Sequence, residues 1–434
     1  MLTLPRPARR RTCDGMTRRD CLQVGTLGLS GLALPDLLRA RAAASQARQP
    51  VKDTSVVWLW LGGGPTQVET FDPKPSAPVE FRSMVGEVAT SLPGVTFGGV
   101  FPRIAQRAQH MGIVRSFAHS NSGHGGGTHY VMTGYDFPPA DNGQNPVKPA
   151  LGAVVGRQRG ASHPQSGMPT YVRLSGIYAD GPSWLGTSYG PFDSGGNAQQ
   201  NMNLTLETNR ISDRRGLLKS LDRIERQVDR TGLMRGLDDF ELQAFDLVLG
   251  RSKEAFYIGR EDPRTRERYG EGLGSQLLLA RRLCEAGCGF VTMHYGGWDL
   301  HGGLVRGMQS LGGPMDQAVA AFIDDVAERG LSERILLVIT GEFGRTPRIN
   351  GNAGRDHWAP LSTLAFAHGG LRTGVVVGES TANAEVPKTT PITPQDMMAT
   401  VFHVLGIDQS VQYLDPAGRP TPMLTSGKPI AELV

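Results

Sequence analysis

Apolar stretches of strand length alternate with longer amphipathic stretches over most of the chain. Residues 54–61 (TSVVWLWL) are almost continuously apolar and stop at three glycines, as in a buried strand that opens into a loop. Similar runs predict strands at 112–117, 169–174, 289–294, 334–340 and 361–367. Amphipathic spacing predicts helices at 100–110, 147–160, 274–287, 313–330 and 394–405. This alternation indicates an α/β fold, with a mostly parallel central sheet and helices on both faces.

Two segments interrupt the alternation. Residues 178–210 are polar and rich in Gly, Ser and Asn, which predicts a surface insertion. Residues 212–258 have helical apolar spacing and predict a second, helical insertion that extends to about 262. We therefore expect a single domain over residues 45–434 that carries both insertions.

The N-terminus has the features of an export signal. Arg18 and Arg19 precede a weakly apolar run (LQVGTLGLSGLALP) and the alanine-rich sequence ARAAAS. A paired arginine before a moderately apolar stretch resembles a twin-arginine signal, and we expect cleavage after Ala44. Met16 is an alternative start, because residues 1–15 add nothing to the pattern. The alternative interpretation is an amphipathic helix with an accidental arginine pair. The signal predicts a periplasmic or extracellular protein that uses the twin-arginine translocase.

The charge distribution argues against a nucleic-acid partner. Of the total formal charge of +4, residues 1–44 contribute eight arginines and three aspartates, so the remaining chain carries −1. A nucleic-acid-binding protein is expected to have a positive surface within its folded part. After the signal, no run of 18 or more apolar residues occurs, so we expect no membrane span in the mature chain. Cys284 and Cys288 are expected to be small buried hydrophobes or a disulfide formed after export.

Residues that could bind a metal or take part in catalysis follow the predicted strands. They are Glu69 and Asp72 after the first strand; His119, Ser122, His124, Thr128 and His129 after 112–117; Asp299 and His301 after 289–294; and Glu342, Arg345, Asp356 and His357 after 334–340. Because parallel strands bring their carboxyl ends to one edge of a sheet, these side chains are expected to converge there. Imidazole nitrogens and carboxylate oxygens are the ligands that Zn²⁺ uses.

Two of these positions have a more specific interpretation. Asp299 and His301 lie between the pairs Gly296-Gly297 and Gly302-Gly303, which let backbone approach a ligand closely. Arg345 is suited to bidentate contact with an anionic substrate. An ion pair with Glu342 or Asp356 is the alternative for Arg345.

Several separated motifs resemble those of a known family. In order they are VVWLWLGGGPTQVETFDPKP, a Ser- and His-rich loop ending in MTG, GGWDLH, GEFGRTPRINGNAGRDHW and PITPQDMMATVFHVLGID. Together they cover nearly all of residues 51–410 and resemble the domain of unknown function 1501 family. That family is similar in turn to the alkaline phosphatase superfamily, which includes sulfatases. The resemblance implies an alkaline-phosphatase-like fold.

The superfamily resemblance also implies roles for individual residues. Asp299 and His301 resemble an Asp and a His that hold one metal, and His357 resembles the late His that completes the set. Glu342 stands where the superfamily has Asp followed by His, but Phe343 occupies the His position. The first strand is followed by glycines where the superfamily has a metal-binding Asp, so only Glu69 or Asp72 could substitute.

The nucleophile is left open by the sequence. Sulfatases place a Cys or Ser nine residues before the Thr of a Thr-Gly pair, and counting back from Thr133 reaches His124. Ser122 and Thr128 are nearby hydroxyls that a metal or His could activate. Alternatively, His124 and His129 are themselves ligands and a metal-bound water attacks.

These features predict an exported, metal-dependent hydrolase of phosphate or sulfate esters. Zinc is the expected ion, with calcium, manganese and magnesium as alternatives, and the substrate is expected to be an anionic small-molecule or polysaccharide ester. The alternative function is a non-catalytic binding protein of the cell envelope on a degenerate fold of the same type.

Overall fold

The computed structural model describes residues 52–136, 147–195 and 251–434. The predicted signal segment 1–44 and residues 196–250, which contain parts of both predicted insertions, lie outside the described residues. Among the described residues, no helix has both the length and the apolar character needed to cross a bilayer.

An eight-stranded sheet lies at the centre of the molecule, with the strand order β12-β4-β11-β8-β1-β7-β5-β6. Its strands are β1 (Ser55–Gly62), β4 (Met111–Val114), β5 (Tyr171–Arg173), β6 (Phe192–Asp193), β7 (Phe290–Gly296), β8 (Ile335–Thr340), β11 (Leu364–His368) and β12 (Val375–Val377). β11 is antiparallel to both of its neighbours, and the other pairs in the sheet are parallel. The predicted mostly parallel α/β sheet is therefore confirmed.

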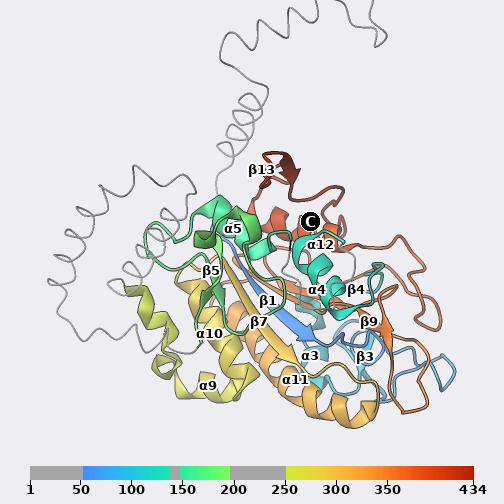
Figure 1. Cartoon of the computed structure of the whole chain (residues 1–434). Helices are drawn as coiled ribbons and strands as arrows, with labels where there is room; N and C mark the ends of the chain where they lie inside the picture. Colours follow the sequence, from blue (N-terminus) through green and yellow to red (C-terminus); the bar gives the residue numbers. More distant parts are fainter. Residues whose placement is uncertain (1–51, 137–146, 196–250) are drawn as a thin grey trace, which may run out of the picture.

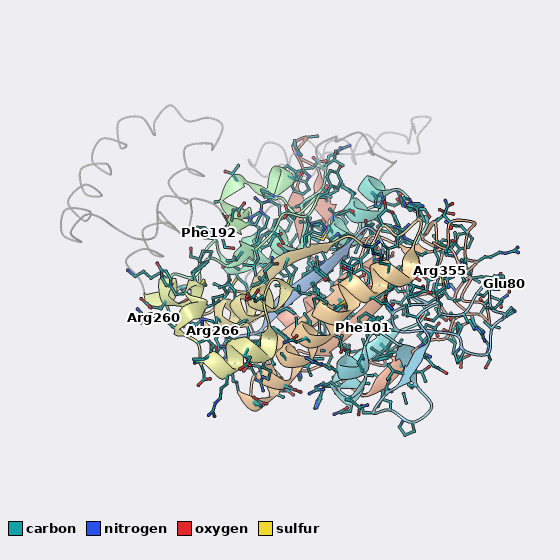
Figure 2. The ribbon with its side chains drawn as sticks, turned by 90° about the horizontal axis from the view of Figure 1, so that it is seen from below. Glu80, Phe101, Phe192, Arg260, Arg266 and Arg355 are labelled. Atoms are coloured by element: carbon teal, nitrogen blue, oxygen red, sulfur yellow. The ribbon has the colours of Figure 1, made fainter. Side chains whose placement is uncertain are left out.

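Helices cover both faces of this sheet (Figure 1). The helices are α3 (Pro102–Ala105), α4 (His124–Thr133), α5 (Leu151–Arg159), α9 (Pro263–Tyr269), α10 (Leu273–Glu285), α11 (Leu304–Glu328) and α12 (Pro394–Leu405). α10 and α11 lie across one face, which Figure 2 shows from their side, and α5 and α12 lie on the other face.

The sequence of β1 explains why both faces are covered. Val57, Leu59 and Leu61 belong to the core cluster that contains α10 and α11 residues. Val56, Trp58 and Trp60 belong to the core cluster that contains α5 and α12 residues. Alternate side chains of a strand point to opposite faces, so an unbroken apolar run fits a strand buried on both sides.

Two helices begin where the sequence predicted something else. The Ser- and His-rich segment before MTG was expected to form a loop, but α4 begins at His124 and includes Gly125–Gly127. A Cβ on Gly127 would lie 2.8 Å from the Glu342 carbonyl oxygen, so this glycine permits close packing of a helix. α11 begins at Leu304 instead of 313, because Gly312 lets the helix pack against Val100 and Pro314 is accommodated inside it.

The remaining strands form short hairpins outside the central sheet. They are β2 (Glu87–Ala89) with β3 (Thr96–Gly98), β9 (Gly344–Arg345) with β10 (His357–Trp358), and β13 (Gln412–Leu414) with β14 (Pro420–Pro422). The β9–β10 hairpin comes between β8 and the antiparallel β11. Since β8 ends and β11 begins at the same edge of the sheet, the hairpin lies at the carboxyl edge of the parallel strands.

A charged network joins the helices on the α10 side. Glu261 forms ion pairs with Arg281, Arg282 and Arg329 at 2.5, 2.9 and 2.8 Å. Burial opposes ionisation of Glu261, but the hydrogen bonds from Arg281 and Arg282 outweigh it and lower the pKa of Glu261 to about 2. The network therefore stabilises the folded state while Glu261 is ionised.

We expect this stabilisation to be lost in acid. Because the pKa of Glu261 is lower in the folded chain than in the unfolded chain, where it is about 4.3, its contribution is present above pH 5 and disappears as the pH falls toward 2. Denaturant unfolding of Glu261→Gln should show a loss of about 2 kcal/mol at pH 7 that shrinks steadily below pH 5. A loss that does not change with pH would contradict this assignment.

Candidate metal centre

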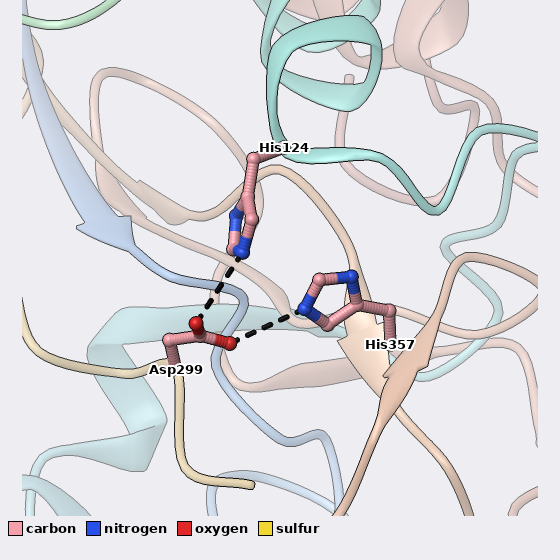
Figure 3. A group of neighbouring side chains, drawn as sticks. All are labelled: His124, Asp299 and His357. Carbon is pink, nitrogen blue, oxygen red and sulfur yellow. Dashed lines mark hydrogen bonds and ion pairs between the residues drawn. The ribbon is translucent and has the colours of Figure 1, made fainter. Parts of the chain in front are cut away.

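Three loops at the carboxyl edge of the sheet bring His124, Asp299 and His357 together (Figure 3). His124 is the first residue of α4, Asp299 follows β7, and His357 is the first residue of β10. One ligand atom from each residue lies within 4.8 Å of the others. The ligand atoms of a single cation with bonds near 2 Å lie about 3–4 Å apart, so these side chains are close to the positions that such a cation requires.

Each imidazole at this centre is held through its Nδ1 atom. His124 Nδ1 lies 2.8 Å from a Glu342 carboxylate oxygen, and His357 Nδ1 donates to the Ser122 carbonyl oxygen at 3.0 Å. His301 Nδ1 lies 2.6 Å from a carboxylate oxygen of Asp356. Oxygen acceptors on Nδ1 place the proton there and leave Nε2 as a free electron-pair donor, as is usual for metal-binding histidines.

The three Nε2 atoms converge on the Asp299 carboxylate. They lie 3.5 Å (His124), 3.2 Å (His357) and 3.0 Å (His301) from its oxygens. The Nε2 atoms of His301 and His357 are 3.0 Å apart. With the Nδ1 atoms protonated, these contacts bring lone pairs together, which is unfavourable unless a cation lies between them. The donor set of His124, Asp299 and His357 therefore fits a divalent cation, and His301 lies beside Asp299 and His357 as a further donor.

Arg345 keeps Asp299 ionised. Its guanidinium forms an ion pair with Asp299 and donates to the carbonyl oxygens of Gly63, Gly64 and Arg355. Burial raises the pKa of Asp299, but the hydrogen bond and charge of Arg345 outweigh this effect and lower the pKa to about 2. A carboxylate with so low a pKa is available as a ligand at neutral pH.

The sequence predicted that Arg345 would contact an anionic substrate. In the structure the Arg345 side chain is only 1% exposed, and its hydrogen bonds go to the protein. Its partner is Asp299 and not Glu342 or Asp356, the two partners that the sequence analysis considered. Arg345 therefore pairs with the candidate ligand Asp299 from the buried side of the centre.

Glu342 lies behind His124 and also carries an unpaired oxygen. One carboxylate oxygen accepts the Gly63 N–H at 2.8 Å and faces His124 Nδ1. The other oxygen is buried and has no hydrogen-bond partner among the described residues. The hydrogen bond to Glu342 raises the pKa of His124, whereas burial and the charge of Arg345 lower the pKa of His357. Glu342 thus orients His124 and leaves one oxygen for a proton, water or cation.

Glu69 and Asp72, the other two predicted carboxylate ligands, are engaged elsewhere. Glu69 is fully buried and binds the equally buried Arg355 through both oxygens, the shortest contact being 3.0 Å. Asp72 pairs with Lys74 at 3.2 Å and Arg115 at 3.4 Å, and Ser380 donates to it. Both carboxylates compensate buried or partly buried cations, so we do not include them in the centre.

The two candidate hydroxyl nucleophiles and the candidate ligand His129 occupy different positions. Ser122 lies beside the centre, where its hydroxyl accepts the Ala359 N–H at 2.9 Å and its carbonyl holds His357. Thr128 is buried in α4, one turn after His124. His129 is also buried, and its Nδ1 donates to the Tyr135 carbonyl at 2.9 Å. Ser122 and His124 are thus at the centre.

One contributor was missed from the sequence. Asp356 was noted beside His357 but not chosen as a site residue, and it is the partner of His301. The hydrogen bond from His301 lowers the pKa of Asp356. Its position directly before His357 in RDHW was the available signal.

Solved structures with similar folds include several hydrolases of low sequence identity. The PsFucS1 sulfatase from Pseudoalteromonas sp. is 14% identical with a TM-score of 0.39, over 85% of this chain and 70% of its own. The phosphonate monoester hydrolase SpPMH from Silicibacter pomeroyi is 13% identical with a TM-score of 0.39, over 82% and 74%. TAB5 alkaline phosphatase is 10% identical with a TM-score of 0.35, over 83% and 100%.

A search of curated proteins gives no match to the sequence. The family described as Protein of unknown function (DUF1501) matches residues 53–434, which is most of the chain. This match confirms the resemblance seen in the separated motifs, and the protein belongs to that family.

Proposed function

We propose that the protein is a metal-dependent hydrolase of phosphate or sulfate esters. The observation that carries the proposal is the convergence of three Nε2 atoms on Asp299, each imidazole being held at Nδ1 by an oxygen. The ester class is supported by the ordered motifs that resemble the alkaline phosphatase superfamily.

In this proposal His124, Asp299, His301 and His357 hold the cation. Three nitrogens and one oxygen suit tetrahedral Zn²⁺, which we propose as the ion. A cation bound there would polarise the ester and lower the pKa of a water molecule. Glu342, Asp356 and the Ser122 carbonyl fix the imidazole orientations, and Arg345 keeps Asp299 anionic.

We propose water as the attacking group. His124 occupies the position that the sulfatase pattern gives to the nucleophile, but its Nε2 faces Asp299 and its Nδ1 is bound to Glu342. Both nitrogens are therefore engaged in holding the centre. The oxygen of water would form the new bond to phosphorus or sulfur, and the bond to the alcohol oxygen would break as that oxygen takes up a proton.

We further propose an anionic small-molecule or polysaccharide ester as substrate and a periplasmic or extracellular location after twin-arginine export. The Asp299 and His301 side chains are 46% and 45% exposed, so solvent reaches the centre between the described loops. A bulky ester could approach such a centre from outside.

Metal analysis and activity assays of the exported protein test this function. We expect about one equivalent of a transition metal, and turnover of aryl phosphate, phosphodiester, phosphonate or sulfate esters that stops on chelation and returns with Zn²⁺ or Mn²⁺. His301→Ala and His357→Ala should lose activity, while His403→Ala, in an exposed histidine of α12, should keep it.

Two outcomes separate the alternatives. Less than half an equivalent of any transition metal would remove the basis of the proposal. A fully loaded protein without turnover on any of these esters would favour the non-catalytic envelope binding protein.

A further inference from the structure

A large cavity lies at the opposite, amino edge of the sheet. Its volume is about 680 Å³, and its wall includes Ser55 at the start of β1 and residues directly before β5, β7 and β8. The charged and titratable residues in its wall are Lys52, Asp53, Arg159, His163, Glu285 and Arg334. This amino-edge cavity has the size of a site for a small organic ligand.

The charges in the wall are unevenly compensated. Asp53 is paired with Arg334 at 2.7 Å, and Glu285 is paired with Arg281 at 2.5 Å. Lys52 and Arg159 form no ion pair with any described residue, and the Lys52 ammonium contacts only the His403 carbonyl at 3.3 Å. Both acids are thus paired with other arginines, while Lys52 and Arg159 have no carboxylate of the described residues within ion-pair distance, Asp53 acting on Arg159 only at longer range.

Arg159 is the more unusual of the two cations because it is largely buried. Its terminal nitrogens donate to the Lys52, Thr54 and Leu405 carbonyl oxygens and to the Thr54 hydroxyl. Its Nε is buried and has no hydrogen-bond partner among the described residues. Burial lowers the pKa of Arg159 to about 10, so the group remains charged at neutral pH. A buried, unpaired charge is costly, and a bound anion would offset that cost.

Neighbouring groups complete a wall of hydrogen-bond donors. His163 Nδ1 accepts the Ser166 N–H at 3.2 Å, which places the imidazole proton on Nε2 as a donor. The absence of a side chain at Gly289 leaves space for Arg159, because a Cβ at position 289 would lie 3.2 Å from a guanidinium nitrogen. Gly287 does the same for His163, whose ring would be 2.9 Å from a Cβ at that position.

We propose that the amino-edge cavity binds a small organic anion, a molecule of sugar size that carries a phosphate, sulfate or carboxylate group, through Arg159 and Lys52. The cavity is larger than an inorganic oxyanion requires, so the remaining volume would take the organic part of the ligand. The proposal does not depend on hydrolytic activity, because the residues that carry it lie at the edge opposite the candidate metal centre.

Calorimetric titration of the full chain at constant ionic strength tests the proposal. The probes are inorganic phosphate, inorganic sulfate, glucose 6-phosphate and glucuronate, with glucose as the uncharged control. We expect at least one organic anion to bind more tightly than its inorganic counterpart, and glucose not to bind. Lys52→Met should weaken binding at least about fivefold. The matched control is Arg264→Met, which removes a cation from the exposed side of α9 and should change nothing.

Arg159→Met should weaken binding further, but its four hydrogen bonds also support the fold. Circular dichroism of this variant therefore accompanies the titration, and Lys52→Met keeps the test valid if Arg159→Met does not fold. Each titration is repeated in His357→Ala to remove anion binding at the candidate metal centre. The proposal is overturned if no anion binds at millimolar concentration, if Lys52→Met binds like the wild type, or if binding disappears in His357→Ala.

Discussion

Asp299→Asn is expected to abolish both metal binding and hydrolysis. Asp299 is the carboxylate on which three imidazole Nε2 atoms converge, and its low pKa makes it the anionic ligand of the set. An asparagine keeps the volume but loses the negative charge. Loss of a partner behind a metal ligand typically costs 10–100-fold in affinity, so loss of the ligand itself should cost at least about 100-fold. We expect kcat to fall at least about 1000-fold, because the cation supplies several kcal/mol of transition-state stabilisation.

Two further variants serve as comparisons for Asp299→Asn. Asp356→Asn removes charge from the partner of His301 but no ligand, and should reduce metal affinity by about 10–100-fold. Asp324→Asn removes a partly exposed carboxylate that pairs with Arg107, and should leave metal content unchanged. Metal content measured after dialysis against a graded chelator series would rank the three. Wild-type affinity in Asp299→Asn would exclude the proposed centre.

Glu69→Gln is expected to destabilise the fold without affecting the metal centre. Glu69 and Arg355 are both fully buried, and Glu69 also accepts the Thr66 hydroxyl at 2.6 Å and the Met84 N–H at 3.1 Å. Removing one charge leaves the Arg355 guanidinium buried without its anion. Breaking a buried pair in this way costs about 3–5 kcal/mol.

The measurement is denaturant unfolding, combined with metal content per folded molecule. Glu385→Gln, in an exposed glutamate, is the control and should change the free energy of unfolding by less than about 0.5 kcal/mol. Should Glu69→Gln retain full stability but lose bound metal, Glu69 would instead be the ligand that the sequence suggested.

The sequence predicted secondary structure best where a single physical requirement, such as burial, determined the residue pattern. Strand β1 was predictable because burial on two faces gives a continuous apolar run, and helix α12 was predictable because its apolar residues have amphipathic spacing. α4 was not predictable, because glycines that indicate a loop serve here for close packing against Glu342. A run of glycines looks the same in the sequence whether it forms a loop or permits close packing of a helix.

The sequence predicted part of the residue set of the candidate site but not the division of roles among these residues. Histidines and carboxylates after parallel strands indicate a cation site, yet partner choice depends on distances between distant segments. Nothing local shows that Glu69 faces Arg355 or that Arg345 faces Asp299, since 286 and 46 residues separate these pairs. The apolar run of β11 likewise gave no indication that this strand is antiparallel to its neighbours.

The β9–β10 hairpin sets the order in which this centre can assemble. Ser122 and His357, which it brings into contact, are 235 residues apart in the chain. A growing chain on the ribosome therefore presents His124 and Asp299 long before His357 exists. The full ligand set can form only when the C-terminal half has been synthesised and packed, so ion capture would be a late event that follows folding. Chains that stop before His357 would lack the centre, and occupancy would report that synthesis has passed the β9–β10 hairpin.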